Sequence, residues 1–310
     1  MGPKAMIDVD VLIPHYMDVG GLTASLNSVG QQTFTGKVRT VIVDDGSSAS
    51  VLAQVRQLIE RCGLDVVLLV NEQNRGRPYT RNRLLDAVDA SHLAWLDAGD
   101  TWYPDKLAAQ AAHLEALHVQ GADAAGTWVT CDYDWRWEGK SASLVQQVVD
   151  GDQLRAILLG QQLRAYLWSL LCPTQSMKEL GGFDEQLPRL QDLDMFIRFI
   201  ASGGKLDKPV FSAPRPLCVY EKSDVGRDAA QIRACNEHIF AKHEALFRRY
   251  GPDFVKQTRL RAELLSARFA KNNGDGRLFA YFMARAFLRA PVRAARTVLQ
   301  KTVLKRGAEG

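Results

Sequence analysis

Short apolar runs alternate with amphipathic stretches over the first hundred residues. The apolar runs, rich in Val, Ile and Leu, are Val9–Ile13, Val38–Val43, Val66–Val70 and Leu93–Leu96. The stretches with helical spacing between them are Gly21–Gln31, Val51–Cys62 and Thr80–Ala90. Continuous apolar runs are typical of strands buried on both faces of a sheet, and strands joined through helices pair in parallel. The pattern therefore predicts an α/β fold with a mostly parallel central sheet flanked by helices.

The pattern changes after the first hundred residues. The further elements expected are helices at Lys106–Gln120, Asp152–Leu163 and Met195–Ala201, a strand at Thr127–Tyr133, and a loop with a short edge strand at Pro209–Tyr220. From Asp228 onward almost every segment has helical spacing. We therefore expect two domains, an α/β domain over residues 6–225 and a helical region over residues 226–310 that is basic at its end.

Composition and charge exclude a few classes of protein. The chain has 310 residues, of which 46% are hydrophobic, and a formal net charge of +4, which gives no indication of a nucleic-acid partner. The five cysteines are scattered without a CxxC pair, as expected of free thiols in a reducing compartment. The sequence contains no apolar run of about 18 residues and no signal-peptide pattern, so we expect a cytoplasmic protein.

Carboxylates follow two of the predicted strands. Asp44 and Asp45 end the second strand, and Asp97 and Asp100 follow the fourth. Ligands of open α/β sheets bind at the carboxyl ends of the strands. A single aspartate at such a position is most often a helix cap or a turn residue. Two pairs on one rim repel each other unless a cation lies between them, which indicates a divalent metal that carries phosphates.

Six segments, taken together and in this order, resemble glycosyltransferase family 2, the inverting enzymes of the GT-A fold. They are Ile13–Tyr16, Val43–Ser48, Asn74–Asn82, Leu96–Leu107, Gly181–Glu185 and Gln191–Arg198. Any one of them is a weak signal, but their shared order over residues 13–198 makes the resemblance specific. It implies a GT-A catalytic domain that moves a sugar from a nucleotide diphosphate to an acceptor hydroxyl, in bacterial cell-surface polysaccharide or glycolipid synthesis.

The resemblance also implies roles for particular residues. Asp192 is the expected catalytic base, because a carboxylate within reach of the acceptor hydroxyl can take its proton. A divalent cation, Mn²⁺ or Mg²⁺, is expected at Asp97 and Asp100. The expected contacts of the nucleotide sugar, with a UDP-sugar favoured, are Pro14, Tyr16, Asp44, Asp45, Asn74, Arg81 and Asp97. The residues expected on the acceptor side are Gly182, Phe183, Asp184 and Gln191.

Two positions depart from the family pattern. Gly99 stands where the main metal-binding aspartate often lies. Either Asp100 takes over, or Asp97 holds the metal together with phosphates and water, or metal dependence is weak. Gln191 stands where a glutamate is common beside the base. Lys222 is a candidate for positive charge near the leaving diphosphate, in a stretch where the family often has a histidine.

Other functions stay open on the sequence alone. A nucleotidyltransferase also uses carboxylates on an α/β sheet, but the basic glycine-rich loop that it needs is reduced here to Gly20 and Gly21. A catalytically inactive GT-A-like binding or scaffold subunit is the second alternative, and Gly99 and Gln191 favour it. Donor hydrolysis measured with and without metal separates such a subunit from an enzyme.

The end of the sequence is basic. Residues 277–306 contain eight basic side chains and no acidic ones. The arginines that recur at helical spacing are Arg285, Arg289, Arg293 and Arg296. We expect either a helix packed on its own domain with a solvated basic face, or a helical segment on an anionic membrane surface near a lipid-linked acceptor. The second alternative makes the protein peripheral on the inner face of the cytoplasmic membrane.

Overall fold

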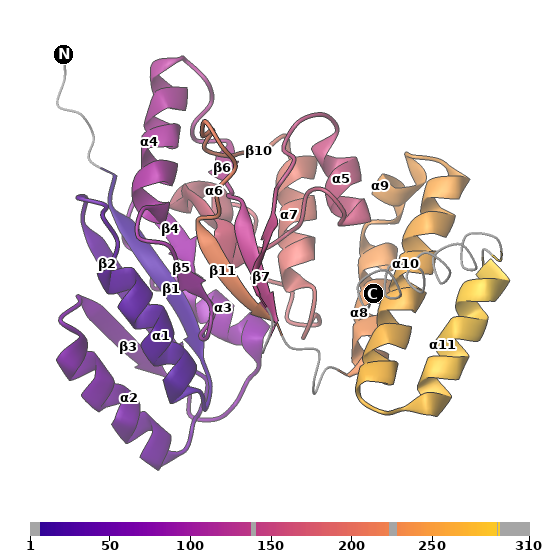
Figure 1. Cartoon of the computed structure of the whole chain (residues 1–310), viewed down its shortest axis with the longest axis horizontal. Coiled ribbons are helices and arrows are strands. Elements are labelled where there is room, and N and C mark those ends of the chain that lie inside the picture. Colours follow the sequence, from indigo (N-terminus) through magenta and orange to yellow (C-terminus); the bar gives the residue numbers. More distant parts are fainter. Residues whose placement is uncertain (1–6, 138–140, 223–227, 290, 292–310) are drawn as a thin grey trace. The chain divides into compact units, whose positions relative to one another are not determined.

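The structure, a computed structural model, describes residues 7–137, 141–222, 228–289 and 291. The chain divides into two compact units, Met1–Lys222 and Ser223–Gly310. The first unit combines a seven-stranded sheet and a four-stranded sheet with helices, and the second unit is helical (Figure 1). The predicted α/β class with a C-terminal helical extension is confirmed.

The large sheet has the strand order β10-β6-β9-β4-β1-β2-β3. The strands of its parallel half are β1 (Val9–His15), β2 (Val38–Asp44), β3 (Val66–Val70) and β4 (His92–Trp95). Consecutive residues Val11, Leu12 and Ile13 are all fully buried, as expected of a strand covered on both faces. The register pairs His15 with Asp44, so β1 and β2 end level with each other at one rim.

Three helices connect the parallel strands: α1 (Val19–Gly30), α2 (Ala49–Cys62) and α3 (Arg77–Asp86). Helices α1 and α2 lie side by side (Figure 1). The Asp18 side chain accepts a hydrogen bond from Gly21 N at 2.8 Å and caps α1, and α2 ends at Gly63, whose φ of 69° favours glycine. Turn chemistry encoded in the sequence therefore sets where these helices begin and end.

The other half of the large sheet is mixed. It consists of β6 (Thr127–Val129), β9 (Leu171–Pro173) and β10 (Lys205–Asp207). β9 runs antiparallel between β4 and β6, and β10 pairs parallel with β6 at the edge. The single strand predicted at Thr127–Tyr133 is wrong, because the chain leaves the large sheet after Val129. Thr130 N donates to Asp207 O at 2.8 Å where the chain turns away.

The small sheet has the order β5-β11-β7-β8. Its strands are β5 (Thr101–Trp102), β7 (Tyr133–Trp137), β8 (Ser143–Val145) and β11 (Cys218–Lys222). The prediction of an edge strand near Tyr220 is wrong, because β11 pairs with β5 on one side and with β7 on the other. The pairing of β5 with β11 joins the segment after the Asp97–Asp100 turn to the last strand of the first unit.

The remaining helices of the first unit are α4 (Lys106–Val119), α5 (Gln153–Leu159), α6 (Thr174–Lys178) and α7 (Gln191–Ala201), with a 3₁₀ turn η1 (Leu167–Ser169). α5 ends at Leu159 and not at the predicted Leu163, because Gly160 takes a left-handed conformation with φ 57° and caps the helix. α7 begins at Gln191, earlier than the predicted Met195, so Asp192 lies in its first turn.

The second unit consists of α8 (Ala229–Lys242), α9 (Glu244–Arg248), α10 (Pro252–Asn272) and α11 (Gly276–Arg289). α10 and α11 lie side by side, and α8 packs against α10 (Figure 1). α11 buries Phe282 and Ala286, and Ala286 packs with Leu260 of α10. Arg293 and Arg296 lie outside the described residues. Within the described part of the chain, no helix is long and apolar enough to cross a membrane.

Candidate functional site

A single guanidinium joins two of the predicted site carboxylates. Arg81 lies on α3, Asp97 follows β4, and Asp192 lies on α7. Arg81 Nη2 donates to both carboxylate oxygens of Asp97, at 2.8 and 2.9 Å, and Arg81 Nη1 donates to Asp192 Oδ1 at 2.5 Å. Arg81 and Asp192, which are 111 positions apart in the chain, therefore meet in one charge cluster.

Arg81 keeps its charge in the core of the unit. Its side chain is 1% exposed, and its guanidinium carbon lies 5.9 Å from the ring centre of Trp95 and 5.8 Å from that of Phe183. Burial disfavours the charged guanidinium, but the charges of Asp192 and Asp97 outweigh burial and raise the pKa of Arg81. The planar donor fork of Arg81 is used on carboxylates here, and its contact with a nucleotide stays a prediction.

The two aspartates in the first turn of α7 have different surroundings. Asp194 is fully buried and accepts a hydrogen bond from Arg198 Nε at 2.9 Å, so it forms the ion pair expected of a structural residue. Asp192 is 22% exposed, and among the described residues nothing donates to its Oδ2. Leu190, which precedes the helix, has φ 63°, a conformation that non-glycine residues rarely adopt. Asp192 thus keeps one carboxylate oxygen for a ligand, while Asp194 is committed to Arg198.

The two aspartates at the end of β2 bind main-chain and side-chain groups of their own rim. Asp44 is fully buried, and its Oδ2 lies 2.7 Å from His15 Nδ1 while its Oδ1 accepts from Ser47 N at 2.8 Å. Asp45 is also buried. The donors to Asp45 are Asn71 Nδ2 at 2.8 Å, Arg75 N at 2.9 Å and Gly76 N at 2.9 Å. Both carboxylates therefore fix neighbouring loops, and their contact with a nucleotide stays a prediction.

The exposed part of this rim follows β1. Tyr16 is 50% exposed, and Met17 beside it has φ 59° and donates from its main-chain N to Ser47 Oγ at 2.8 Å. Pro14 is half-buried at the end of β1, and Asn74 is exposed, with its Oδ1 accepting from Gly76 N at 3.2 Å. Among the residues predicted to contact the nucleotide, Tyr16 and Asn74 thus offer open surface to a ligand.

The predicted metal ligands are already bonded to other groups. Both oxygens of Asp97 accept from Arg81, and Asp100 is 6% exposed, with its Oδ1 3.3 Å from the main-chain N of Glu221. Burial, and then the charge of Asp97, raise the pKa of Asp100 well above its ordinary value. The described residues contain no group of three or more His, Cys, Asp or Glu side chains that could hold a metal ion. As arranged, these carboxylates do not fit a resident divalent ion, which takes ionised oxygen ligands.

The turn that carries Asp97 and Asp100 is built around Gly99. Gly99 has φ 99°, and its main-chain N donates to Ser25 Oγ at 3.1 Å. The Ser25 hydroxyl in turn donates to Asp100 O at 2.8 Å. A side chain at position 99 would strain this backbone, although its Cβ would meet Asp18 Oδ2 only at 3.9 Å, an ordinary van der Waals distance. The glycine that departs from the family pattern is therefore also a conformational requirement of the turn.

The predicted acceptor-side residues surround Asn82 and the start of α7. Asn82 Oδ1 accepts from Phe183 N at 2.6 Å, and Asn82 Nδ2 donates to Phe183 O at 3.0 Å. Gly182 has φ 83°, and a Cβ there would lie 2.9 Å from Asn82 Oδ1. Asp184 Oδ1 accepts from Gln186 N at 3.0 Å, and Gln191 is buried. These residues hold the segment before α7 against α3, and contact with an acceptor stays a prediction.

Sequence reasoning missed the residues that hold the site together. Asn71 and Asn82 each make side-chain hydrogen bonds to a predicted site segment, and Arg83 donates to Val70 O and to Asn71 Oδ1, both at 2.6 Å. Sequence reasoning also missed the burial of Arg81, although Arg81 lies three and four residues before the buried Leu84 and Leu85 on α3. That spacing places the arginine on the core-facing side of its helix.

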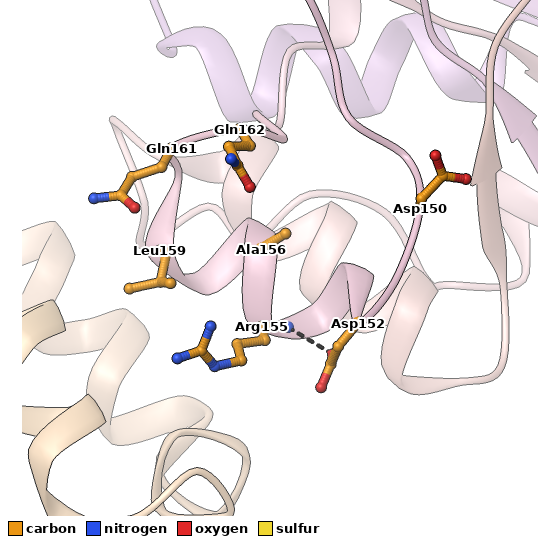
Figure 2. A pocket seen from close by; sticks show the side chains of 7 residues that line it. All are labelled: Asp150, Asp152, Arg155, Ala156, Leu159, Gln161 and Gln162. Carbon is orange, nitrogen blue, oxygen red and sulfur yellow. Dashed lines mark hydrogen bonds between the residues drawn. The ribbon is translucent and has the colours of Figure 1, made fainter.

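A separate depression of about 180 Å³ lies beside α5 in the first unit (Figure 2). Its lining residues are Asp150, Asp152, Arg155, Ala156, Leu159, Gln161 and Gln162. The hydrogen bond drawn there, from Arg155 N to Asp152 Oδ1 at 2.9 Å, is the N-terminal cap of α5. The depression shares no residue with the Arg81 cluster, so we assign it no part in the chemistry.

Comparison with known families identifies the family of the chain. The sequence profile of the family described as Glycosyl transferase family 2 matches residues 10–177, more than half of the chain. The chain therefore belongs to glycosyl transferase family 2. The resemblance seen in the sequence is confirmed, and the nucleotidyltransferase alternative is set aside. The matched range contains Arg81 and Asp97, whereas Asp192 lies beyond it.

Two curated relatives are glycosyltransferases that this chain matches over part of their length. The amylovoran biosynthesis glycosyltransferase AmsB of Erwinia amylovora is 31% identical over 116 residues, which cover 37% of this chain and 38% of that protein. The pre-mycofactocin glycosyltransferase of Mycobacterium tuberculosis is 26% identical over 212 residues, which cover 64% of this chain and 40% of that protein. The chain thus spans less than half the length of these relatives.

Solved structures show the same fold. Residues 1–349 of S. aureus TarS, solved alone, with UDP and with UDP-GlcNAc, match with a TM-score of 0.57 at 15% identity over 91% of this chain and 91–92% of that one. The mannosyltransferase PcManGT of Pyrobaculum calidifontis, solved with GDP-Man and Mn²⁺, matches with a TM-score of 0.57 at 20% identity, covering 96% of this chain and 79% of that one. These likenesses establish the predicted GT-A fold.

Proposed function

We propose that this glycosyltransferase transfers a sugar from a nucleoside diphosphate to an acceptor hydroxyl with inversion, using Asp192 as the base. The observation that supports this proposal is the bridge from Asp97 through Arg81 to Asp192. It brings a carboxylate at the nucleotide-binding rim of the sheet into one cluster with a carboxylate on α7. Donor and acceptor must meet at such a place for transfer to occur.

In the proposed step the acceptor oxygen attacks the anomeric carbon on the face opposite to the diphosphate. The bond from that carbon to the diphosphate oxygen breaks, and its electron pair leaves with the nucleoside diphosphate. Asp192 Oδ2 takes the proton of the acceptor hydroxyl as the new bond forms. Arg81 holds Oδ1 of the same carboxylate at 2.5 Å and so keeps Oδ2 in one orientation. Because attack and departure occur on opposite faces, the configuration inverts.

The proposed donor is a UDP-sugar held along the rim that contains Tyr16 and Asp97. TarS was solved with UDP and UDP-GlcNAc, and PcManGT with GDP-Man. These ligands support a nucleotide-sugar donor, whose base is either uracil or guanine. Tyr16 is exposed and can stack on the base. Since Asp44 and Asp45 are buried, we propose that they act mainly by shaping the loops that receive the nucleotide.

We propose that a divalent cation binds only together with the phosphates of the donor. PcManGT was solved with Mn²⁺, and Mg²⁺ and Mn²⁺ commonly bind through one or two carboxylates together with substrate phosphates. In this chain the carboxylates of Asp97 and Asp100 are committed to protein contacts. We therefore propose that no ion is held before the donor binds, and we assign it no step in the transfer.

The proposed acceptor is a bacterial cell-surface glycan or a lipid-linked precursor. The support is the name of AmsB, an amylovoran biosynthesis glycosyltransferase. We also propose that residues 277–306 bring the enzyme to an anionic membrane surface, since Tyr281, Phe287 and Leu288 of α11 are exposed apolar residues. Co-sedimentation of the full chain with anionic vesicles at low salt tests this location, and an unbound protein would contradict it.

A catalytically inactive binding subunit is the second candidate function. The misfit between Asp97, Asp100 and a resident metal favours it. Such a subunit would bind a nucleotide sugar without turning it over. Donor hydrolysis in the absence of acceptor, followed by release of nucleoside diphosphate with and without Mn²⁺, distinguishes the two, because an inactive subunit releases none under either condition.

The experiment that tests the proposed function begins with a thermal-shift screen of nucleotide sugars. A ligand that binds the folded protein raises its melting temperature by mass action. The nucleotide sugar that raises the melting temperature most is therefore the candidate donor. The donor is then incubated with bacterial glycan acceptors, and the anomeric configuration of the product is read by NMR. Inversion relative to the donor is the expected result. A product that retains the donor configuration would contradict the single displacement.

A further inference from the structure

Three arginines surround one buried carboxylate in the helical unit. Glu263 of α10 is fully buried, and its Oε1 accepts from Arg285 Nε at 3.1 Å and from Arg289 Nε at 3.0 Å, both on α11. Arg233 Nη2 of α8 lies 3.2 Å from the same oxygen. We refer to Arg233, Arg285 and Arg289 as the arginine cluster. Three of the helices visible in the second unit of Figure 1 contribute to it.

Positive charge exceeds negative charge in the arginine cluster. Three guanidinium groups face Glu263. Among the described residues, Glu237 of α8, which pairs with Arg233, is the second carboxylate in contact. All three arginines crowd Oε1 of Glu263, while its Oε2 is buried and has no partner among the described residues. Burial, together with repulsion from Arg285 and Arg289, lowers the pKa of Arg233 despite the attraction of Glu263. One more anion would relieve this repulsion.

Donor groups of the cluster remain available at its surface. The side chains of Arg285 and Arg289 are 33% and 27% exposed, so solvent ions can reach them. Arg285 Nη1 donates to Tyr281 Oη at 3.0 Å. In the part of the chain that the structure describes, nothing accepts from Nη2 of Arg285 or from either Nη of Arg289. The unused donors belong to planar forks, which match the spacing of phosphate oxygens.

We propose that Arg285 and Arg289, supported by Arg233, form a binding site for a phosphate group, either free or esterified. The two arginines are four residues apart on α11, so they lie on the same side of the helix. Glu263 draws their Nε atoms inward and thereby holds the two forks in place. The site lies outside the Asp97–Arg81–Asp192 cluster, and the inference does not rest on the proposed transfer reaction.

The first test is calorimetric titration of the full chain with inorganic phosphate at constant ionic strength, with chloride as the reference anion. We expect saturable binding that Arg289→Gln weakens about tenfold or more, the effect of losing charge-assisted hydrogen bonds. Arg277→Gln is the matched control, because Arg277 is exposed on the same helix and carries the same charge. Absence of saturable binding, or equal binding by both variants, would overturn the proposal. Equal binding would also place the phosphate elsewhere, such as at the donor rim.

Glu263→Gln distinguishes a phosphate site from a purely structural ion-pair network. Removing the carboxylate leaves the three arginines without their central partner, so phosphate should raise the melting temperature of this variant more than that of the wild type. An equal rise in both proteins would contradict the proposal. If Glu263→Gln does not fold in any buffer, the comparison of Arg289→Gln with Arg277→Gln, with circular dichroism as the control for folding, still decides.

Sedimentation with two kinds of vesicle distinguishes a lipid phosphate from a soluble phosphate. The full chain is sedimented with phosphatidylcholine vesicles that contain or lack phosphatidic acid, whose headgroup is a phosphate monoester. Binding that needs phosphatidic acid and is weakened more by Arg289→Gln than by Arg277→Gln assigns the site to a lipid phosphate. Saturable binding of inorganic phosphate without vesicle binding assigns it to a soluble phosphate. A protein that binds neither overturns the proposal.

Discussion

The two units of this protein stabilise buried charge in opposite ways. In the first unit one guanidinium, that of Arg81, is shared by two carboxylates, Asp97 and Asp192. In the helical unit one carboxylate, that of Glu263, is shared by three guanidiniums. Within the described part of the chain, the first arrangement leaves an unused acceptor oxygen on Asp192, and the second leaves unused donors on Arg285 and Arg289.

The comparison teaches that the hydrogen-bonding groups left over in each cluster indicate what that cluster can bind. A buried charge is tolerated only when partners surround it, so the central ion of each cluster fixes the positions of the outer groups. An outer carboxylate with a free oxygen can take a proton from an acceptor hydroxyl. Outer guanidiniums with free donors can bind an anion. Removing the central ion therefore affects the two units differently.

Arg81→Met should have the largest effect on stability. The substitution leaves Asp97 and Asp192 without their shared cation, and we expect the free energy of unfolding to fall by about 3 kcal/mol. That figure is at the lower end for buried ion pairs because both carboxylates are partly exposed. Urea unfolding measures it, with Arg56→Met on the exposed side of α2 as the control. A change equal to that of the control would show that the bridge contributes nothing.

Glu263→Gln should cost less, about 2 kcal/mol, because Arg285 and Arg289 can turn toward solvent when their partner is lost. The same urea experiment, run with and without inorganic phosphate, sharpens the comparison between the two units. We expect phosphate to restore part of the loss in Glu263→Gln and to restore nothing in Arg81→Met. Equal recovery in both variants would mean that phosphate acts on the whole protein and not at the arginine cluster.

Gly99→Ala should destabilise the protein by about 1–2 kcal/mol, since φ 99° is unfavourable for a residue with a Cβ. Gly20→Ala is the control, because Gly20 lies on the exposed side of α1, where alanine is favoured over glycine. The two substitutions should therefore shift the melting temperature in opposite directions. A stabilising Gly99→Ala would contradict the requirement for glycine in the Asp97–Asp100 turn.

Mn²⁺ alone should leave the melting temperature unchanged, the smallest effect in the series. Asp97 is bonded to Arg81, so the carboxylates present no preorganised metal site. Thermal shift with Mn²⁺, with the donor, and with both together measures the coupling between them. A rise with Mn²⁺ alone that Asp97→Ala abolishes would contradict this view and would restore the metal site expected from the sequence.

The parallel half of the sheet could be predicted from the sequence because its strands are buried on both faces and read as continuous apolar runs. The carboxyl-end rule then placed Asp44 and Asp97 on one rim. The Arg81 bridge could not be predicted, because it joins α3, the turn after β4 and α7, which only the tertiary structure brings together. Local spacing shows which side of α3 is buried but not which charges meet there.

The errors at Thr127–Tyr133 and Asp152–Leu163 have local causes. In the first segment, the chain moves from β6 to β7 of a different sheet, and apolar content alone does not reveal a change of partner. In the second, Gly160 ends the helix early. The difference between Asp192 and Asp194 was also invisible as a pattern of charge. It depends on Arg198, which pairs with Asp194 at 2.9 Å and leaves Asp192 to Arg81.

The rate of sugar transfer by Asp192→Asn tests the central claim most directly. Asparagine keeps the shape of the side chain but cannot take the acceptor proton, so we predict a fall in turnover of about 100-fold or more with donor binding unchanged. Asp86→Asn, an exposed position on α3, is the control and should transfer at the wild-type rate. Turnover by Asp192→Asn close to that of the wild type, with the same acceptor, would contradict the assignment of the base.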